Sequence, residues 1–269
     1  MKQLYLVFTC ALTMAFTIDA QTIQKEEFVI PLTNPANTGR LEVGLHQGGV
    51  KVRGYDGKEV RVTMEIVESD DQAKEKELEK GGLRRINNNS VNVQIEEYDN
   101  TVEISGDHSK QTNFIIQVPQ KFDLNISTHH DGDVTVENVS GTMEVNCHFG
   151  KMNLRDISGS LIADSHHGEI EVTFKAIDAG KPMAFSTYHG DVDVTFPASA
   201  SFDAKVKTTK GEIYTDFDVD MKMMKSEEKT HEDGRRQIKI GGWMYGQVGS
   251  GGEEFMFNTY HGDVIIRQK

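Results

Sequence analysis

The chain has 269 residues, of which 26% are charged, and a formal net charge of −13 at pH 7. This acidic balance excludes a surface built for the phosphate backbone of DNA or RNA, which is bound by clusters of Lys and Arg. The length is large for one globular core but ordinary for one domain of stacked repeats, so we expect a single domain over residues 21–269.

Residues 1–20 have the features of a signal peptide. A lysine stands at the second position, an apolar run extends from Leu4 to Phe16, and Ala20-Gln21 has the pattern of a cleavage site. The run is too short to span a membrane. We therefore expect cleavage between Ala20 and Gln21, no membrane span afterwards, and export to the periplasm, the cell surface or the medium. The mature chain keeps Cys147 as its one cysteine, so its stability has to come from strand stacking.

The front of the mature chain alternates apolar and polar residues, which predicts strands. Gly48 precedes one such stretch and Gly57 the next. Residues 69–82 break the pattern with capping residues, charged helix formers and a final Gly81-Gly82, which predicts a short charged helix. Further alternating stretches follow at 91–95, 102–104, 114–118 and 124–126.

From Gly132 to Gly168 a glycine recurs every nine residues, with apolar residues at the second and fourth positions after each. The repeat continues with looser spacing toward the C-terminus. Its turn glycines are Gly132, Gly141, Gly150, Gly159, Gly168, Gly190, Gly211 and Gly262. Glycine tolerates a sharp turn, and the alternating residues then point in and out of a strand. A short fixed period of this kind predicts a solenoid.

The nine-residue units alternate between two kinds. Val139 and Ile157 stand two residues before their glycines in one kind, whereas histidines stand there in the other. This alternation predicts a coil of about eighteen residues that contains two strands, with one apolar corner and one polar-aromatic corner.

Two segments near the C-terminus are near copies of each other. Residues 180–194 and 252–266 share eight of fifteen positions. Between them, residues 219–246 interrupt the repeat. Asp233-Gly234 stands there between two alternating runs, which is typical of a hairpin turn. We expect this insertion to form a protruding β-hairpin.

Stacking the coils about 4.8 Å apart would place the residues two positions before successive glycines in one column. This candidate corner surface consists of His130, His148, His166, Tyr188 and Tyr260. Neutral imidazole is a common metal ligand and titrates at about pH 6.5, so a metal-binding or pH-sensing stripe is one interpretation. Stacking of flat rings is the other, and tyrosine in the column favours stacking over coordination. We therefore expect no metal or other cofactor.

A column of carboxylates follows the glycines. Its members are Asp133, Glu169, Asp191, Glu212 and Asp263. Calcium-binding nonapeptide repeats require G-G-x-G-x-D. Here the carboxylate comes one position too early, and most turns lack the second glycine. The pattern therefore does not predict calcium binding.

Several of these stretches together resemble a known family. They are residues 41–66, Gly82-Leu83-Arg84-Arg85-Ile86, the 132–173 repeats, STYHGDVDVTFP, KGEIYTDF and NTYHGDVIIRQK. In this order the chain is similar to the bacterial "putative adhesin" family of β-strand repeat domains of unknown function, common in Bacteroidota. The resemblance implies a right-handed parallel β-solenoid and an exported location. It implies no established activity and carries over no catalytic residue.

The sequence leaves three functional hypotheses. The first is an exported, non-catalytic binding or structural module of the cell envelope, with a glycan, an envelope polymer or a protein surface as partner. The second is a self-assembling scaffold, because an uncapped solenoid end exposes a strand edge that can pair with another copy. The third is a glycan-active β-helix enzyme. Short coils leave no walls for a catalytic cleft, so we expect no enzymatic activity.

Overall fold

The computed structural model describes residues 23–67, 91–107, 110–130, 132–223, 227–230, 236–239 and 242–269. The expected signal peptide and the expected helix at 69–82 lie outside these residues. All elements of regular secondary structure in the described part of the chain are strands, which confirms the all-β class. No helix in these ranges could therefore cross a membrane.

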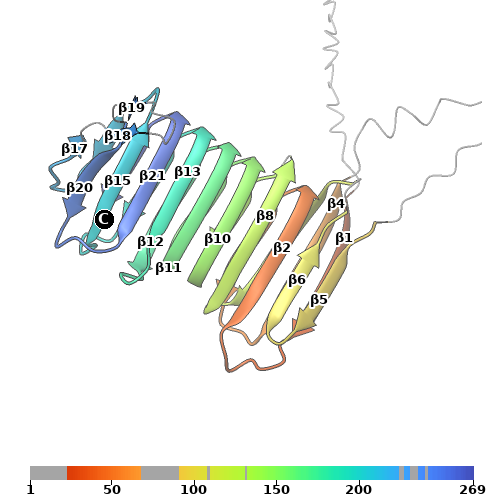
Figure 1. Cartoon of the computed structure of the whole chain (residues 1–269). Helices are drawn as coiled ribbons and strands as arrows, with labels where there is room; N and C mark the ends of the chain where they lie inside the picture. The colour runs from red at the N-terminus through yellow and green to blue at the C-terminus, as the bar shows by residue number, and fades with distance from the viewer. Residues whose placement is uncertain are drawn as a thin grey trace, which may run out of the picture.

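Twenty strands form one hydrogen-bonded sheet that is folded into two faces. Figure 1 shows the strands lying side by side in a long row. In spatial order, face A consists of β6 (Thr101–Ser105), β2 (Gly39–Gln47), β8 (Phe122–His130), β10 (Ser140–Phe149), the second half of β11 (Met152–His167), β13 (Met183–His189), β21 (Glu254–His261) and β15 (Phe202–Thr208). Face B consists of β7 (Thr112–Pro119), β3 (Val50–Tyr55), β9 (Val134–Glu137), the first half of β11, β12 (Ile170–Ile177), β14 (Val192–Phe196), β22 (Val264–Gln268) and β16 (Ile213–Thr215).

Neighbouring strands within each face run parallel. Ser140 of β10 pairs with Ser158 of β11, and Met152 of β11 pairs with Ile170 of β12. Neighbouring residues of β10, β11 and β12, such as Ser140 and Ser158, therefore lie 18 residues apart in the sequence. A face A strand and the face B strand that follows it form one coil.

Two coils lie out of sequence order, as Figure 1 shows. The coil β2–β3 lies between β6–β7 and β8–β9, although it precedes both in the sequence. The coil β21–β22 lies between β13–β14 and β15–β16. The two near-copy segments are therefore direct neighbours, with Met183 opposite Phe255 and Thr187 opposite Thr259. The sequence did not predict this arrangement.

Antiparallel strands cover the ends of the parallel stack. At one end β4 (Glu59–Val67) pairs with β7, β1 (Ile23–Pro31) pairs with β4, and β5 (Gln94–Tyr98) pairs with β6. At the other end β20 (Met244–Val248) pairs with β15, and β17 (Lys222–Met223) pairs with β20. Within the described residues, self-association through the sheet edges would therefore start from these covering strands or from β16.

The expected hairpin insertion contains two paired strands. They are β18 (Glu227–Thr230) and β19 (Arg236–Lys239), which pair antiparallel with Thr230 opposite Arg236. The residues between them, which include Asp233-Gly234, lie outside the described ranges. This pair forms a sheet separate from the stack.

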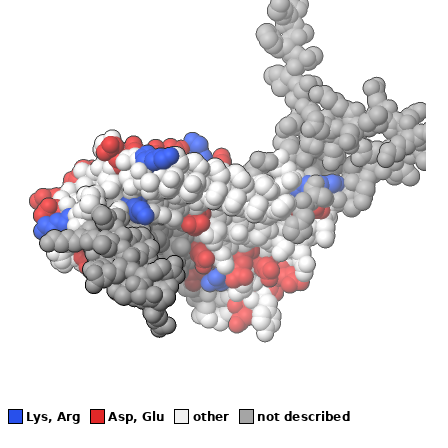
Figure 2. Space-filling view, turned by 45° about the horizontal axis from the view of Figure 1, so that its top comes forward, with Lys and Arg blue, Asp and Glu red and all other residues white. Residues whose placement is uncertain are grey.

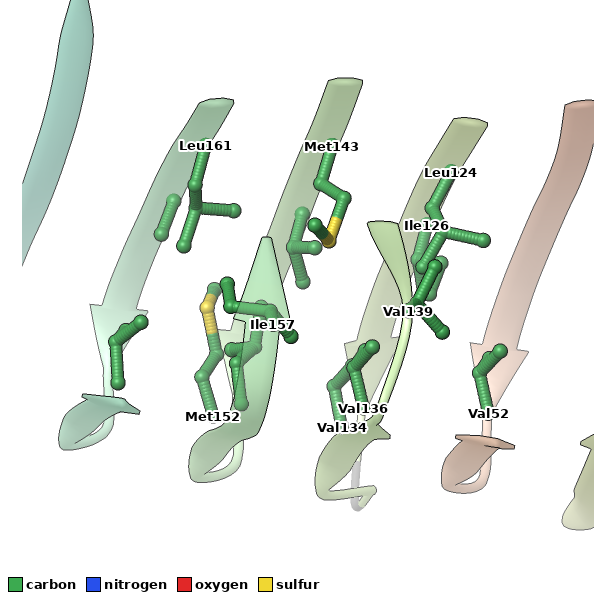
Figure 3. Close-up of a cluster of buried hydrophobic side chains, with 14 of the residues drawn as sticks. Val52, Leu124, Ile126, Val134, Val136, Val139, Met143, Met152, Ile157 and Leu161 are labelled. Carbon is green, nitrogen blue, oxygen red and sulfur yellow. The ribbon is translucent and has the colours of Figure 1, made fainter. Parts of the chain in front are cut away.

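The core lies between the two faces and is filled by the inward member of each alternating pair. Figure 3 shows the side chains of Leu124, Met143 and Leu161 from face A facing those of Val134 and Met152 from face B. All five are at most 2% exposed. Toward the C-terminal coils the core becomes aromatic, with stacks such as Phe185 on Phe257. Burial of this apolar row is the main force that holds the faces together.

Candidate functional site

Two columns of aromatic rings run along the end of face A, where its strands turn toward face B. The inner ring column consists of His46, His129, His148, His166, Tyr188 and Tyr260. The outer ring column consists of His130, Phe149, His167, His189 and His261. The centroids of His148 and His166 are 4.8 Å apart with 3° between the ring planes, and those of Tyr188 and Tyr260 are 4.8 Å apart with 6°. Strand spacing sets this distance, so the rings lie flat on one another.

The structure places four of the five predicted corner residues in the inner ring column and His130 in the outer one. Thr128 of β8 lies opposite Cys147 of β10, so His129 lies beside His148. On face B, Val134 lies opposite Met152. The turn after β8 therefore contains one residue more than the turn after β10. Counting back from the glycine assumed equal turns and missed His129 and His46.

Contrary to the expectation that short coils leave no walls for a cleft, a groove of about 530 Å³ runs beside the inner ring column on the outer surface of face A. Its other wall is a polar column, in which five residues stand two positions before a ring and Lys207 of β15 lies opposite Asn258. This polar column consists of Ser127, Asn146, Asp164, Ser186, Asn258 and Lys207. Because neighbouring rings cover each other's faces, a ligand can reach only the ring edges, which include the edges of the exposed side chains Tyr188 and Tyr260. The groove is therefore a hydrogen-bonding surface, not an aromatic platform.

Small side chains between the two walls form the floor of the groove. The hydroxyl of Thr187 donates to the carbonyl of Gly168 at 3.0 Å, and that of Thr259 donates to the carbonyl of Gly190 at 3.0 Å. The buried thiol of Cys147 donates to a turn carbonyl in the same way. Burial raises the pKa of this thiol. These three side chains thus tie their turns to the neighbouring ones, whereas the buried hydroxyls of Thr128 and Ser165 make no hydrogen bond within the described residues.

Six of the eight predicted turn glycines lie between strands, whereas Gly141 lies within β10 and Gly159 within β11. A Cβ added at any of the eight predicted turn glycines would overlap backbone of the neighbouring coil, such as the carbonyl oxygen of Gly150 for Gly168. Four of them also have positive φ between +112° and +145°, namely Gly150, Gly159, Gly190 and Gly262. Close approach of backbones is therefore the requirement that all eight share, and the left-handed conformation is an additional one at some turns.

The carboxylate column caps backbone N–H groups of the neighbouring coil. Asp133 accepts from the N–H of Lys151 at 2.8 Å, and Asp191 accepts from the N–H of Asp263 at 2.7 Å. Asp263 in turn accepts from the N–H of Glu212 at 2.8 Å. These bonds satisfy turn donors that no strand pairing reaches. Within the described ranges, no cluster of three or more His, Cys, Asp or Glu side chains could hold a metal ion.

Crowding of the rings changes the proton affinity of the columns. The pKa values of His148, His167 and His189 are lowered from 6.5, mainly by desolvation and further by repulsion from neighbouring histidines. One Nδ1 of the adjacent pair His166 and His167 donates to the other at 2.7 Å, which links the two columns. The pKa of Asp164 is raised, because desolvation outweighs its hydrogen bond with Ser186 and the attraction of His166.

We expect the protein to lose stability when the pH falls from about 7.5 to about 5.5. The unfolded chain protonates these three histidines at about pH 6.5, whereas the folded chain does so at lower pH, so their contribution is complete above that value and is lost as the pH falls. Asp164 acts in the opposite direction and at lower pH, since its ordinary pKa is 3.8. The urea midpoint measured at both pH values checks this prediction, with His148→Gln expected to show a smaller drop. An unchanged wild-type midpoint would contradict it.

Comparison with known proteins supports the repeat family. Residues 123–242 match the family model described as Toastrack DUF4097. A putative adhesin from Bacteroides fragilis is similar in structure, with 14% identity, a TM-score of 0.43, and coverage of 93% of this chain and 98% of that one. A putative cell adhesion protein from Clostridium sporogenes has 13% identity, a TM-score of 0.36, and coverage of 92% and 100%. No curated protein matches the sequence. The match of residues 123–242 to the Toastrack DUF4097 model agrees with the resemblance that the repeats predicted.

Proposed function

We propose that this protein is an exported, non-catalytic binding module of the bacterial cell envelope, whose groove holds an extended, uncharged glycan. The observation that carries the proposal is the repetition of the groove walls. Five adjacent strands of face A, namely β8, β10, β11, β13 and β21, each add one residue of the polar column and one of the inner ring column, about 4.8 Å after the previous pair. A polymer of repeating units meets one polar side chain and one ring edge at every step. The proposed coil is right-handed, the sense that connections between parallel strands nearly always take.

The charge of the chain favours an uncharged ligand. A net charge of −13 repels polyanions at long range. Figure 2 shows acidic side chains gathered toward the bottom of that view, with few Lys or Arg among them. Within the groove, Lys207 and Asp164 offset each other. A neutral sugar chain can use the hydroxyl, amide and ring-edge groups without burying a charge.

The groove floor supports binding without chemistry. The thiol of Cys147 is buried and its pKa is raised, so it stays protonated and is a poor nucleophile. The hydroxyls of Thr187 and Thr259 already donate to turn carbonyls. These side chains serve the fold, and the outward walls remain for a ligand. The signal-peptide features of the sequence support export.

A glycan array tests this function. We expect the full chain to bind neutral envelope glycans in preference to anionic ones. The double variant Asn146→Ala/Asn258→Ala removes two amides from the polar column, and two lost hydrogen bonds reduce affinity by about tenfold or more. The matched control is Thr135→Ala/Thr195→Ala, which removes two half-buried side chains from the outer surface of face B.

Three outcomes would contradict the proposal. The first is an array with no bound glycan, and the second is equal loss of affinity in the groove variant and in the face B control. Stronger binding of anionic polymers would contradict the choice of an uncharged ligand. Thermal unfolding of both double variants shows whether a loss of binding comes from a loss of fold.

A further inference from the structure

We propose that the coil β21–β22 exchanges between copies of this chain, so that residues 254–268 of one copy fill the slot between β13–β14 and β15–β16 of another. The occupant of the slot is then a second copy of the same segment. This proposal goes beyond ligand binding and rests on the strand order alone.

The coil β21–β22 makes most of its contacts with the coils on either side of it. β21 pairs with β13 on one side and β15 on the other, while β22 pairs with β14 and β16. The inward side chains Phe255 and Phe257 stack on Phe202 at 4.5 Å and on Phe185 at 5.1 Å, respectively. Every one of these partners lies outside the coil. The same contacts form whether one chain or two supply the two sides, which is the condition for exchange without loss of interactions.

Specific polar contacts hold the coil in one register. The guanidinium of Arg267 donates to both carboxylate oxygens of Asp193, and Thr259 donates to the carbonyl of Gly190. The N–H of Asp263 donates to the carboxylate of Asp191 at 2.7 Å. A segment arriving from another copy carries the same anchors, so it enters in the same register.

The connection before the coil is suited to act as a hinge. β20 stays paired with β15 at the end of the stack, and Gly249-Ser250-Gly251-Gly252 then leads to β21. Gly249 and Gly251 have φ of +58° and +75°. A glycine-rich segment crosses between backbone conformations at little cost, so the coil can leave the slot while the rest of the stack remains. Everything after the hinge travels with it.

Exchange would also join the grooves of two copies. Asn258 of the polar column and Tyr260 of the inner ring column both lie on β21. In an exchanged pair, each groove is completed by these two residues from the other copy. A polymer-binding groove would then be shared along the assembly.

Cross-linking between copies tests the exchange. Ser186 and Asn258 are opposite residues on β13 and β21, with Asn258 Nδ2 3.5 Å from Ser186 Oγ. Opposite residues in parallel strands lie within the Cα separation that a disulfide needs. We would mix a full chain carrying S186C with one carrying N258C, refold them from urea at high concentration and oxidise. Exchange predicts a covalent heterodimer on a non-reducing gel, increasing with protein concentration.

A matched pair of variants provides the control. Ser140 and Ser158 are also opposite residues, on β10 and β11, but both precede the hinge. A mixture of S140C and S158C chains should therefore give several-fold less heterodimer. The double variant S186C/N258C should close the bond within one chain at low concentration.

Heterodimer no more abundant than in the S140C/S158C mixture would overturn the proposal. A second readout does not depend on disulfide geometry. Wild-type protein refolded at high concentration should contain a dimer on size exclusion that persists after dilution, because re-exchange requires the slot to open again. A purely monomeric profile after refolding would overturn the proposal on its own.

Discussion

Gly150→Val is expected to lower the free energy of unfolding by at least about 3 kcal/mol. Gly150 has φ +144°, which a β-branched residue adopts only with strain. A Cβ at this position would also overlap the carbonyl oxygen of Gly132 in the neighbouring coil. Gly132 cannot move away freely, because it lies against the backbone of Gly48 in the next coil. The strain therefore has to be absorbed by the whole row of turns.

Urea unfolding of the variant measures the loss, and Gly44→Val is its matched control. Gly44 lies within β2, and a Cβ there would meet no atom within 4 Å. Valine also favours strands, so this control should stay within about 0.5 kcal/mol of the wild type or gain stability. Equal stability of Gly150→Val and the wild type would show that the turn accommodates a side chain, contrary to the packing described above.

This glycine row explains why the strand pattern could be predicted from the sequence. Each of these glycines is required by close contact with the backbone of the next coil, so the spacing of the glycines in the sequence reflects the period of the stack. Val134 and Val136 after Gly132, for example, are both buried inward residues of β9. The periodic pattern predicted strands and inward positions because both depend on neighbouring residues in the sequence.

The composition of the ring columns was harder to predict, because it depends on the length of each turn. One additional residue between Thr128 and Val134 moves His129 into register with His148 and shifts His130 to the outer column. The sequence contains a signal of this difference. Asp131 separates the histidine pair from Gly132, whereas Phe149 directly precedes Gly150. Choosing between the two registers requires knowing which residues pair across the strands.

The order of the coils could not be derived from periodicity at all. Strands with the same alternating pattern can pair with any neighbour, so nothing in the period places β2–β3 or β21–β22 inside the stack. The similarity of residues 180–194 and 252–266 was the available signal, since these segments are direct neighbours. Similar segments stack well because identical residues, such as His189 and His261, lie over each other.

The inserted coil leads to the second large effect, which is a global loss of stability in Phe257→Ala. Phe257 is 0% exposed, stacks on Phe185 at 5.1 Å and meets Phe196 edge-on at 6.1 Å. Removal of a fully buried phenylalanine costs about 3–5 kcal/mol, because the cavity collapses only in part. The matched control is Tyr98→Ala, since Tyr98 of β5 is 84% exposed. Its cost should stay below about 1 kcal/mol.

The form of the Phe257→Ala transition tests the coil order itself. In a stack where each coil contacts only its neighbours, weakening the last coil frays one end and leaves the remaining coils intact. The coil β21–β22 instead lies between β13–β14 and β15–β16, so its loss separates both sides of the stack. Trp243, the one tryptophan, lies next to β20 and reports on the far side, where Lys205 Nζ is 5.1 Å from its ring centroid. The urea midpoints of the variant, measured by Trp243 fluorescence and by far-UV circular dichroism, should therefore shift to lower urea by the same amount. A separate early transition seen by one probe alone would mean that this coil is peripheral.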